Sequence, residues 1–306
     1  MLNRLFARRS GDAPLLTGQE IAELTAAAPP RAADRPTRRP RAGRPGEQVS
    51  PRLGSGGDFA EPRAYHPGDD PRRIDWRASA RSRTPLVRSY HAELIRPNCL
   101  VIDRRASMRF GTRTRLKVTQ AVRIALWLAG REVRAGGELA AVLLDDPCQW
   151  LPPSRGVRAL RWLADRAAAP CPPREPGCGE PGWGKVLAGL RQRLPQGSEL
   201  TIVSDFTALG TGDIGLLRAL GRHCECHAIR IIDRLERDPL PPAAWELCWG
   251  GDRYAFDATD STAVAALRDG QRALETFLAA EFRLAGITFH VLPADVDTLA
   301  ELAVPR

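Results

Sequence analysis

The sequence predicts an α/β fold in which helices cover both faces of a mostly parallel sheet, the doubly wound arrangement. Short segments that are apolar at nearly every position, such as 99–103, 139–145 and 200–205, alternate with longer segments of helical periodicity. Strands of this kind are typically buried on both faces, as in a parallel sheet. The regular alternation of strand and helix favours right-handed crossovers, and 306 residues suffice for one such domain with smaller accessory segments.

Residues 1–47 are expected to form a short helix followed by a flexible basic tail. Residues 17–28 predict the helix, because Thr17 and Glu20 have the spacing of a capping box. Residues 29–47 are dominated by proline and arginine and contain no large apolar side chain, which is typical of a disordered or polyproline-like linker.

Residues 48–96 predict a small segment that contains a β-hairpin. Pro67 and Gly68 indicate a turn between β-type stretches near 64–65 and 86–90. The segment is too short to bury a core of its own, so we expect it to pack on the residues that follow.

Residues 97–306 are expected to form the main domain. Its strands are predicted over 99–103, 139–145, 200–205, 226–233 and 287–292, and its helices over 116–134, 154–168, 183–194, 214–222 and 261–284. Gly250 and Gly251 lie between two short strand-like runs and indicate a hairpin over 245–258.

The charge and the cysteine content narrow the class of protein. A net charge of +9 favours attraction to acidic surfaces, anionic lipid or nucleic acid. The seven cysteines show no regular spacing, no secretory signal precedes them, and no apolar run has the length of a membrane span. We therefore expect a cytoplasmic protein with reduced cysteines and no transmembrane segment. Leu2, Leu5 and Phe6 allow at most a weak peripheral contact with a membrane.

Acidic residues stand at the ends of three predicted strands. These residues are Asp103, Asp145 and Asp205, and the hydroxyls of Ser107 and Ser204 lie close to them in the sequence. Ligands of open parallel sheets bind beyond the carboxyl ends of the strands. Because carboxylate and hydroxyl oxygens are the ligands that Mg²⁺ and Mn²⁺ prefer, this edge of the sheet is the candidate site.

Two motifs resemble known families. The strand followed by "DxxxS", together with the later strand that ends in "SD", resembles a von Willebrand factor A-type domain, a Rossmann-like fold. The upstream stretch "YHPGDDPRRIDWRASAR" resembles the signature of a bacterial family known as domain-of-unknown-function family 58. The resemblance runs from about residue 57 to the end of the sequence. The signature residues present here are Arg63, Tyr65, Pro67, Gly68, Asp69, Asp70, Arg72, Ile74, Asp75, Trp76, Ala80 and Arg81.

The A-type resemblance implies a metal-ion-dependent adhesion site, here in degenerate form. Asp103 and Ser107 match the first aspartate and the last serine of its aspartate-x-serine-x-serine motif, and Asp205 matches its later aspartate. Arg105 stands where the first serine belongs, and the threonine of such sites has no convincing counterpart in 182–185. We expect Arg105 to pair with one of the two aspartates in place of a metal, since a guanidinium beside a divalent cation adds like-charge repulsion. Bound Mg²⁺ or Mn²⁺ is the less favoured alternative, and no other cofactor is expected.

The sequence favours a non-catalytic protein that binds other proteins. It contains no nucleophile elbow, phosphate-binding loop or zinc-protease helix. The family resemblance implies a MoxR-type AAA+ ATPase as the partner, with the chain acting as an adaptor or assembly factor for a client. On this hypothesis Arg105 meets an acidic side chain of the partner directly. The signature stretch is either a docking face or an ion-pair and stacking cluster that fixes the segment to the main domain.

Two other functional classes stay open. A basic protein associated with nucleic acid or another anionic surface would use residues 31–44, although that stretch lacks the interleaved aromatic side chains of single-strand binders. A divalent-metal-dependent binding protein or hydrolase would use Asp103, Ser107 and Asp205.

Overall fold

The computed structural model describes residues 13–27, 63–66, 70–87, 96–112, 114–172, 179–238, 243–249, 252–297 and residue 299. Two compact units are present: residues 1–34 together with 96–306, and residues 35–95. Some predictions concern residues outside the described ranges: residues 1–10, the tail 29–47 with its basic stretch 31–44, Pro67, Gly68 and Asp69, and Gly250 and Gly251 of the hairpin turn.

A six-stranded sheet forms the centre of the larger unit, with the strand order β10-β7-β6-β3-β4-β5. Five strands run parallel, and only β5 at one edge is antiparallel to its neighbour. The strands are β3 (Asn98–Asp103), β4 (Glu138–Leu144), β5 (Gln149–Arg155), β6 (Glu199–Ser204), β7 (Glu225–Ile232) and β10 (Thr288–Pro293). The predicted doubly wound, mostly parallel α/β class is confirmed.

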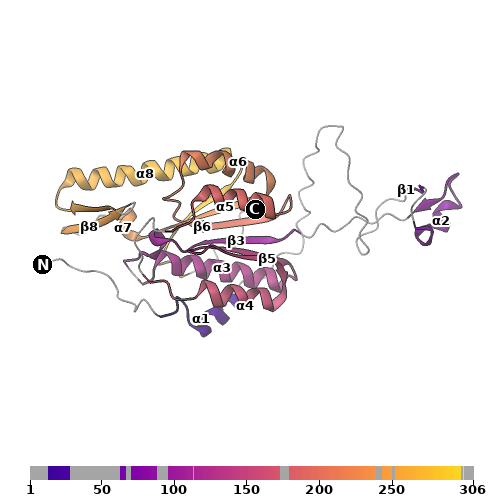
Figure 1. Ribbon diagram of the computed structural model, residues 1–306, viewed down its shortest axis with the longest axis horizontal. Helices are drawn as coiled ribbons and strands as arrows, with labels where there is room; N and C mark the ends of the chain where they lie inside the picture. Colours follow the sequence, from indigo (N-terminus) through magenta and orange to yellow (C-terminus); the bar gives the residue numbers. More distant parts are fainter. Residues whose placement is uncertain are drawn as a thin grey trace. The chain divides into compact units, whose positions relative to one another are not determined.

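Helices cover both faces of this sheet, as Figure 1 shows. One face carries α1 (Gly18–Ala27), α3 (Lys117–Arg134) and α4 (Gly156–Ala167), and the opposite face carries α5 (Trp183–Arg193), α6 (Ile214–His223) and α8 (Ser261–Leu284). Every residue of β3 is buried, because the strand lies in the interior of the sheet between both layers. The continuous apolar runs of the sequence therefore correspond to strands that are covered on two sides.

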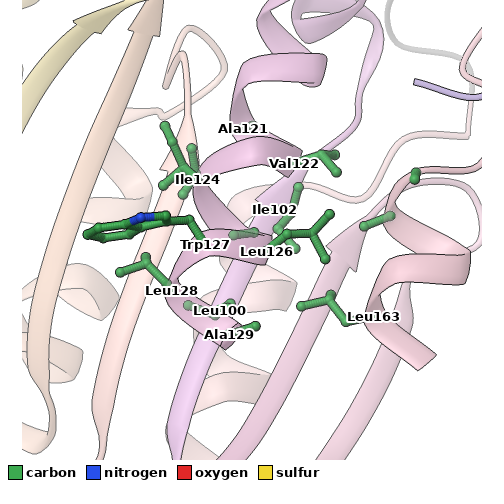
Figure 2. Close-up of a cluster of buried hydrophobic side chains, with 14 of the residues drawn as sticks. Leu100, Ile102, Ala121, Val122, Ile124, Leu126, Trp127, Leu128, Ala129 and Leu163 are labelled. Carbon is green, nitrogen blue, oxygen red and sulfur yellow. The ribbon is translucent and has the colours of Figure 1, made fainter. Parts of the chain in front are cut away.

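The core beneath α3 explains why that helix is almost entirely buried. Leu100 and Ile102 of β3 meet Val122 and Leu126 of α3, and Leu163 of α4 closes the cluster (Figure 2). The outer side of α3 is in turn covered by α1 and α4. A helix packed on three sides has no polar stripe to expose, which matches the long apolar pattern of its sequence.

The first helix belongs to this body. The predicted capping box is present: Thr17 Oγ1 accepts a hydrogen bond from the Glu20 backbone N–H, and the Glu20 carboxylate accepts one from the Thr17 backbone N–H at 2.8 Å. Leu24 is buried against the core of α3. A Cβ atom at Gly130 would overlap the backbone of Thr25, so the glycine permits the close approach of α1 to α3.

The opposite face is closed by aromatic side chains. Phe206 stacks on Trp183 at 5.7 Å between ring centroids and meets the edge of Phe282 at 5.0 Å. Gly221 of α6 lies directly against the backbone of Ala285, at the end of α8. These contacts hold α5, α6 and α8 against the sheet on the side of β6 and β7.

Strand β5 was not predicted. The sequence suggested that the strand over 139–145 leads through a short connection, which contains "QWL", to a helix from about 154. The residues instead form an antiparallel edge strand with an irregular register opposite Leu139 and Ala141, and α4 begins at Gly156. Proline is tolerated there because an edge strand leaves some backbone N–H groups unused.

The remaining predicted elements are present. The hairpin consists of β8 (Ala244–Trp249) and β9 (Asp252–Asp257), which pair antiparallel to each other. The short helix α7 (Arg234–Arg237) follows β7 and was not predicted. This helix supplies Glu236, whose carboxylate forms an ion pair with Lys117 of α3.

The smaller unit contains the signature stretch. Its strands β1 (Arg63–Ala64) and β2 (Leu86–Val87) pair antiparallel, and a 3₁₀ helix (Pro71–Arg73) and α2 (Trp76–Ser79) lie between them in the sequence. The expectation that residues 48–96 pack on the main domain stays a prediction.

Candidate functional site

The carboxyl ends of β3 and β6 bring Asp103 and Asp205 together. The two strands are neighbours in the sheet, and both carboxylates are fully buried. Ser204 Oγ donates a hydrogen bond to Asp103 at 2.6 Å, which joins the end of β6 to the end of β3. Ser107 Oγ donates to Asp205 at 3.2 Å. The structure thus gathers the three residues that the sequence assigned to the degenerate metal site.

Arg105 clamps Asp103. Its Nε and one terminal nitrogen donate to the two oxygens of the carboxylate at 3.0 and 2.7 Å, and its backbone N–H donates at 3.0 Å. The guanidinium also lies 4.7 Å from the centroid of the Trp183 ring and donates to the carbonyl of Pro181. Of the two aspartates that the sequence offered to Arg105, the structure pairs it with Asp103.

The guanidinium of Arg105 is held in its charged form. Burial by itself would lower the pKa of Arg105, but the adjacent carboxylate of Asp103 outweighs that effect and raises the pKa above its ordinary value. The Arg105 side chain is only 4% exposed, so it faces the interior of the site and not the surface.

Lys117 neutralises the other aspartate, a role that the sequence analysis did not predict. Its ammonium lies 2.9 Å from Asp205 Oδ2 and 2.8 Å from Glu236 Oε1 of α7. Only 2% of the side chain is exposed. Burial alone would lower the pKa of Lys117, yet the two carboxylates raise it well above the ordinary range.

The environment of Asp205 fixes its charge as well. Burial alone would raise the pKa of this carboxyl, but the charge of Lys117 outweighs burial and lowers the pKa below its ordinary value. Hydrogen bonds from the Thr207 backbone N–H and from the Ser107 hydroxyl act in the same direction. Asp205 is therefore ionised at neutral pH.

The residue after Asp205 adopts an unusual backbone. Phe206 has a φ of 58°, in the left-handed region that bulky residues rarely occupy. Its amide donates to Ser204 Oγ at 2.9 Å, and its buried ring stacks on Trp183. Local strain of this kind is held in place by the surrounding packing and is characteristic of sites rather than of plain turns.

Asp145 lies apart from this cluster. Its carboxylate accepts hydrogen bonds from Arg104 at 3.0 Å and Arg109 at 2.8 Å. The third strand-end acid is therefore the centre of a separate arginine cluster on the loop after β3. Asp233, at the end of β7, accepts hydrogen bonds from Thr112 and from the backbone of Leu235, which anchors α7 beside the loop.

A divalent cation does not fit the side chains as they are arranged. Both oxygens of Asp103 are engaged by Arg105, and Asp205 is engaged by Lys117. Mg²⁺ requires close to six oxygen ligands, and here two fixed positive charges stand among the few oxygens that converge. Within the described part of the chain, no group of three or more His, Cys, Asp or Glu side chains is placed to hold a metal ion.

Two aspartates of the signature stretch cap short helices. Asp70 accepts a hydrogen bond from the backbone of Arg72, and Asp75 accepts from the backbones of Arg77 and Ala78 at the start of α2. The Tyr65 backbone N–H donates to the carbonyl of Pro85 beside the β1–β2 pair. These contacts give the aspartates a local structural role.

Trp76 differs from the other signature residues because its side chain points outward. It is 71% exposed, the largest exposed fraction among the large apolar side chains of the described residues. Arg72 and Arg81 are also exposed, and the side chain of Arg63 falls outside what the structure describes.

No helix of the described residues is both long enough and apolar enough to cross a membrane. The longest helix of the described residues, α8, has 24 residues and carries charged side chains from Arg268 to Arg283.

Solved structures with related folds are distant from this chain. The conserved hypothetical protein BatB from Bacteroides thetaiotaomicron is 9% identical, with a TM-score of 0.37 over 61% of this chain and 99% of that one. The SpRpn10 VWA domain is 10% identical, with a TM-score of 0.41 over 69% of this chain and 94% of that one. At TM-scores below 0.5 these likenesses do not bear on the site.

Curated relatives and a family model place the chain more firmly. The uncharacterized protein Rv1480 of Mycobacterium tuberculosis (strain H37Rv) is 31% identical over 183 residues, and the uncharacterized protein Mb1516 of Mycobacterium bovis matches equally. The match covers 59% of this chain and 56% of each relative, so the chain spans just over half the length of these relatives. The family model described as "Protein of unknown function DUF58" matches residues 61–246, more than half of the chain. The signature stretch and the strand-end site both lie within the matched residues, and the chain belongs to this DUF58 family.

Proposed function

We propose that the chain is a non-catalytic protein–protein interaction protein, an adaptor that works with a MoxR-type AAA+ ATPase in the assembly or activation of a client. The observation that carries the proposal is the exposed Trp76 on the signature segment. Tryptophan is among the residues that most often dominate the free energy of a protein interface.

The non-catalytic part of the proposal rests on the charges of the strand-end site. General acid–base catalysis needs a group that exchanges a proton near neutral pH. Here the pKa of Lys117 is held above its ordinary value and the pKa of Asp205 below it, so both groups stay charged around pH 7. The cluster suits the rigid support of a binding face better than proton transfer.

The surroundings of Trp76 favour a binding role for it. Asp75 caps α2 through two backbone hydrogen bonds and thereby fixes the helix on which Trp76 is the first residue. Exposed Arg72, Arg77 and Arg81 surround it in the sequence and would pair with an acidic partner surface. An aromatic anchor with a basic rim is a typical composition for a protein interface.

The ATPase is proposed as the partner because the family resemblance implies it. A cytoplasmic location is part of the same proposal. The direct contact of Arg105 with the partner is revised: a guanidinium that is 4% exposed and engaged by Asp103 supports the site from within.

Binding of the purified chain to a MoxR-type ATPase, measured by calorimetry, tests the proposal. Trp76→Ala is expected to weaken the complex by about 30-fold, as the loss of an interface anchor does. Leu284→Ala is the matched control, because Leu284 is a 65% exposed apolar side chain at the end of α8. The control is expected to stay within about twofold of the unmodified chain.

Two results would contradict the proposal. Equal affinity of Trp76→Ala and the unmodified chain would remove Trp76 as the anchor. An unmodified chain that does not bind the ATPase at all would remove the partner. A circular dichroism spectrum of each variant establishes that the loss of binding does not come from unfolding.

A further inference from the structure

We propose that Lys117 is a built-in cation that takes the place of a divalent metal at the strand-end site. This inference concerns the architecture of the site and does not depend on the proposed function. It starts from a buried ammonium that bridges carboxylates from two different elements: Asp205 at the end of β6 and Glu236 on α7.

The position of Lys117 disfavours a lysine in two ways, and only the two carboxylates favour it. Lys117 is the first residue of α3, where the positive end of the helix dipole disfavours a cation. It is also almost fully buried, where an unpaired ammonium would be strongly destabilising. The two carboxylates compensate both effects. The role of Lys117 is therefore to neutralise these carboxylates and not to stabilise the helix.

The composition of the chain supports the same conclusion. The sequence contains only two lysines, Lys117 and Lys185, among 45 basic residues. Arginines occupy the other basic positions around the site, where Arg105 grips one carboxylate with two nitrogens of its planar group. An ammonium is a compact point charge with three donors, and it fits where oxygens converge from different directions, as a metal ion does.

The oxygens around Lys117 are of the kind that bind Mg²⁺ or Mn²⁺. Two carboxylates supply these oxygens. The hydroxyls of Ser107 and Thr207 both donate hydrogen bonds to Asp205 Oδ1, whereas Lys117 contacts Asp205 Oδ2. Removing the ammonium would leave Asp205 and Glu236 without the cation that bridges them. A divalent cation is the simplest group that restores the balance.

The test is thermal unfolding of Lys117→Ala with and without millimolar Mn²⁺. The variant is expected to unfold at a lower temperature than the unmodified chain, and Mn²⁺ is expected to raise its Tm by about 5 °C or more. Lys185→Ala is the matched control, because Lys185 is the other lysine and lies exposed on α5. The unmodified chain and the control should show no specific Mn²⁺ effect.

Adding Asp205→Asn to Lys117→Ala should abolish the Mn²⁺ effect, which identifies the site. A folded Lys117→Ala variant that gains nothing from Mn²⁺ would overturn the proposal. So would an unmodified chain that is stabilised by Mn²⁺ to the same extent as Lys117→Ala.

A second measurement applies if Lys117→Ala does not fold even with Mn²⁺. Lys117→Met is then compared with a triple variant that also carries Asp205→Asn and Glu236→Gln. If Lys117 acts as the cation of the site, neutralising both carboxylates restores a large part of the lost Tm. Equal Tm values for the two variants would mean that Lys117 holds its place by packing alone, and the proposal would fail.

Discussion

Replacing Arg105 with methionine isolates the contribution of its charge to stability. Methionine keeps much of the apolar stem that packs near Trp183 but removes the guanidinium. Asp103 would then keep only the hydrogen bonds from Ser204 Oγ and from the backbone N–H at position 105. The carboxylate is fully buried, so water cannot replace the lost partner without a rearrangement of the site.

The expected loss is large because both members of the pair are buried. Arg105 is 4% exposed and Asp103 is not exposed, so solvent screening does not reduce the interaction. Removing one partner of a buried ion pair typically costs about 3–5 kcal/mol. The buried cation–π contact with Trp183 is worth about 2 kcal/mol, and a contact between the methionine sulfur and the same ring would retain part of it. We expect the free energy of unfolding to fall by about 4 kcal/mol.

Urea unfolding at pH 7, followed by circular dichroism, measures this change. Arg158→Met is the control, because Arg158 is exposed on α4, and it should stay within about 0.5 kcal/mol of the unmodified chain. The double variant Arg105→Met with Asp103→Leu should regain a large part of the loss, since no charge is left uncompensated. A loss below about 1 kcal/mol in Arg105→Met, or a double variant as unstable as the single one, would refute the reasoning.

Two further predictions concern helix packing and acid stability. Gly221→Ala is expected to lower the free energy of unfolding by about 2 kcal/mol or more, because its Cβ would overlap the backbone of Ala285. Gly270→Ala on α8, where a Cβ meets nothing within 4 Å, should raise it by about 0.5–1 kcal/mol, and equal effects in urea unfolding would contradict this packing. The folded-state pKa of Asp205 is depressed, so its stabilising contribution is full above the unfolded pKa of about 3.9 and is lost as the pH falls through the folded pKa. Asp205→Asn should therefore show a smaller drop in urea midpoint below about pH 4 than the unmodified chain, and parallel pH profiles would count against the ion pair with Lys117.

The fold was predictable from the sequence where one signal dominated. The strands that are apolar at nearly every position, such as β3, indicated burial on two faces, and their alternation with helices determined the class. β5 was missed because Pro152 and Pro153 mask its strand character, and only its pairing with β4 defines it. The helix at 18–27 was predicted, yet its docking through Leu24 depends on a partner helix far away in the sequence.

Of the ion pairs in the candidate site, only the acidic residues at the strand ends could be predicted from the sequence. Strand ends are marked in the sequence, so Asp103 and Asp205 could be found. Lys117 gave no signal, because a lysine at the start of a helix normally reaches into solvent. Lys117 is buried because the fold places the carboxylates of Asp205 and Glu236 against its ammonium. Both residues lie about a hundred residues away along the chain.

The two edges of the central sheet have a consequence for how the protein behaves at high concentration. Within the described part of the chain, strands β5 and β10 each pair with one neighbour only, and an open edge of that kind can recruit a strand from another molecule. Pro152 and Pro153 in β5 and Pro293 in β10 carry no backbone N–H, and the register irregularity in β5 further disturbs its outer edge. The prolines and the irregular register make both borders of the sheet poor templates for an additional strand, which lowers the tendency of the chain to aggregate edge to edge.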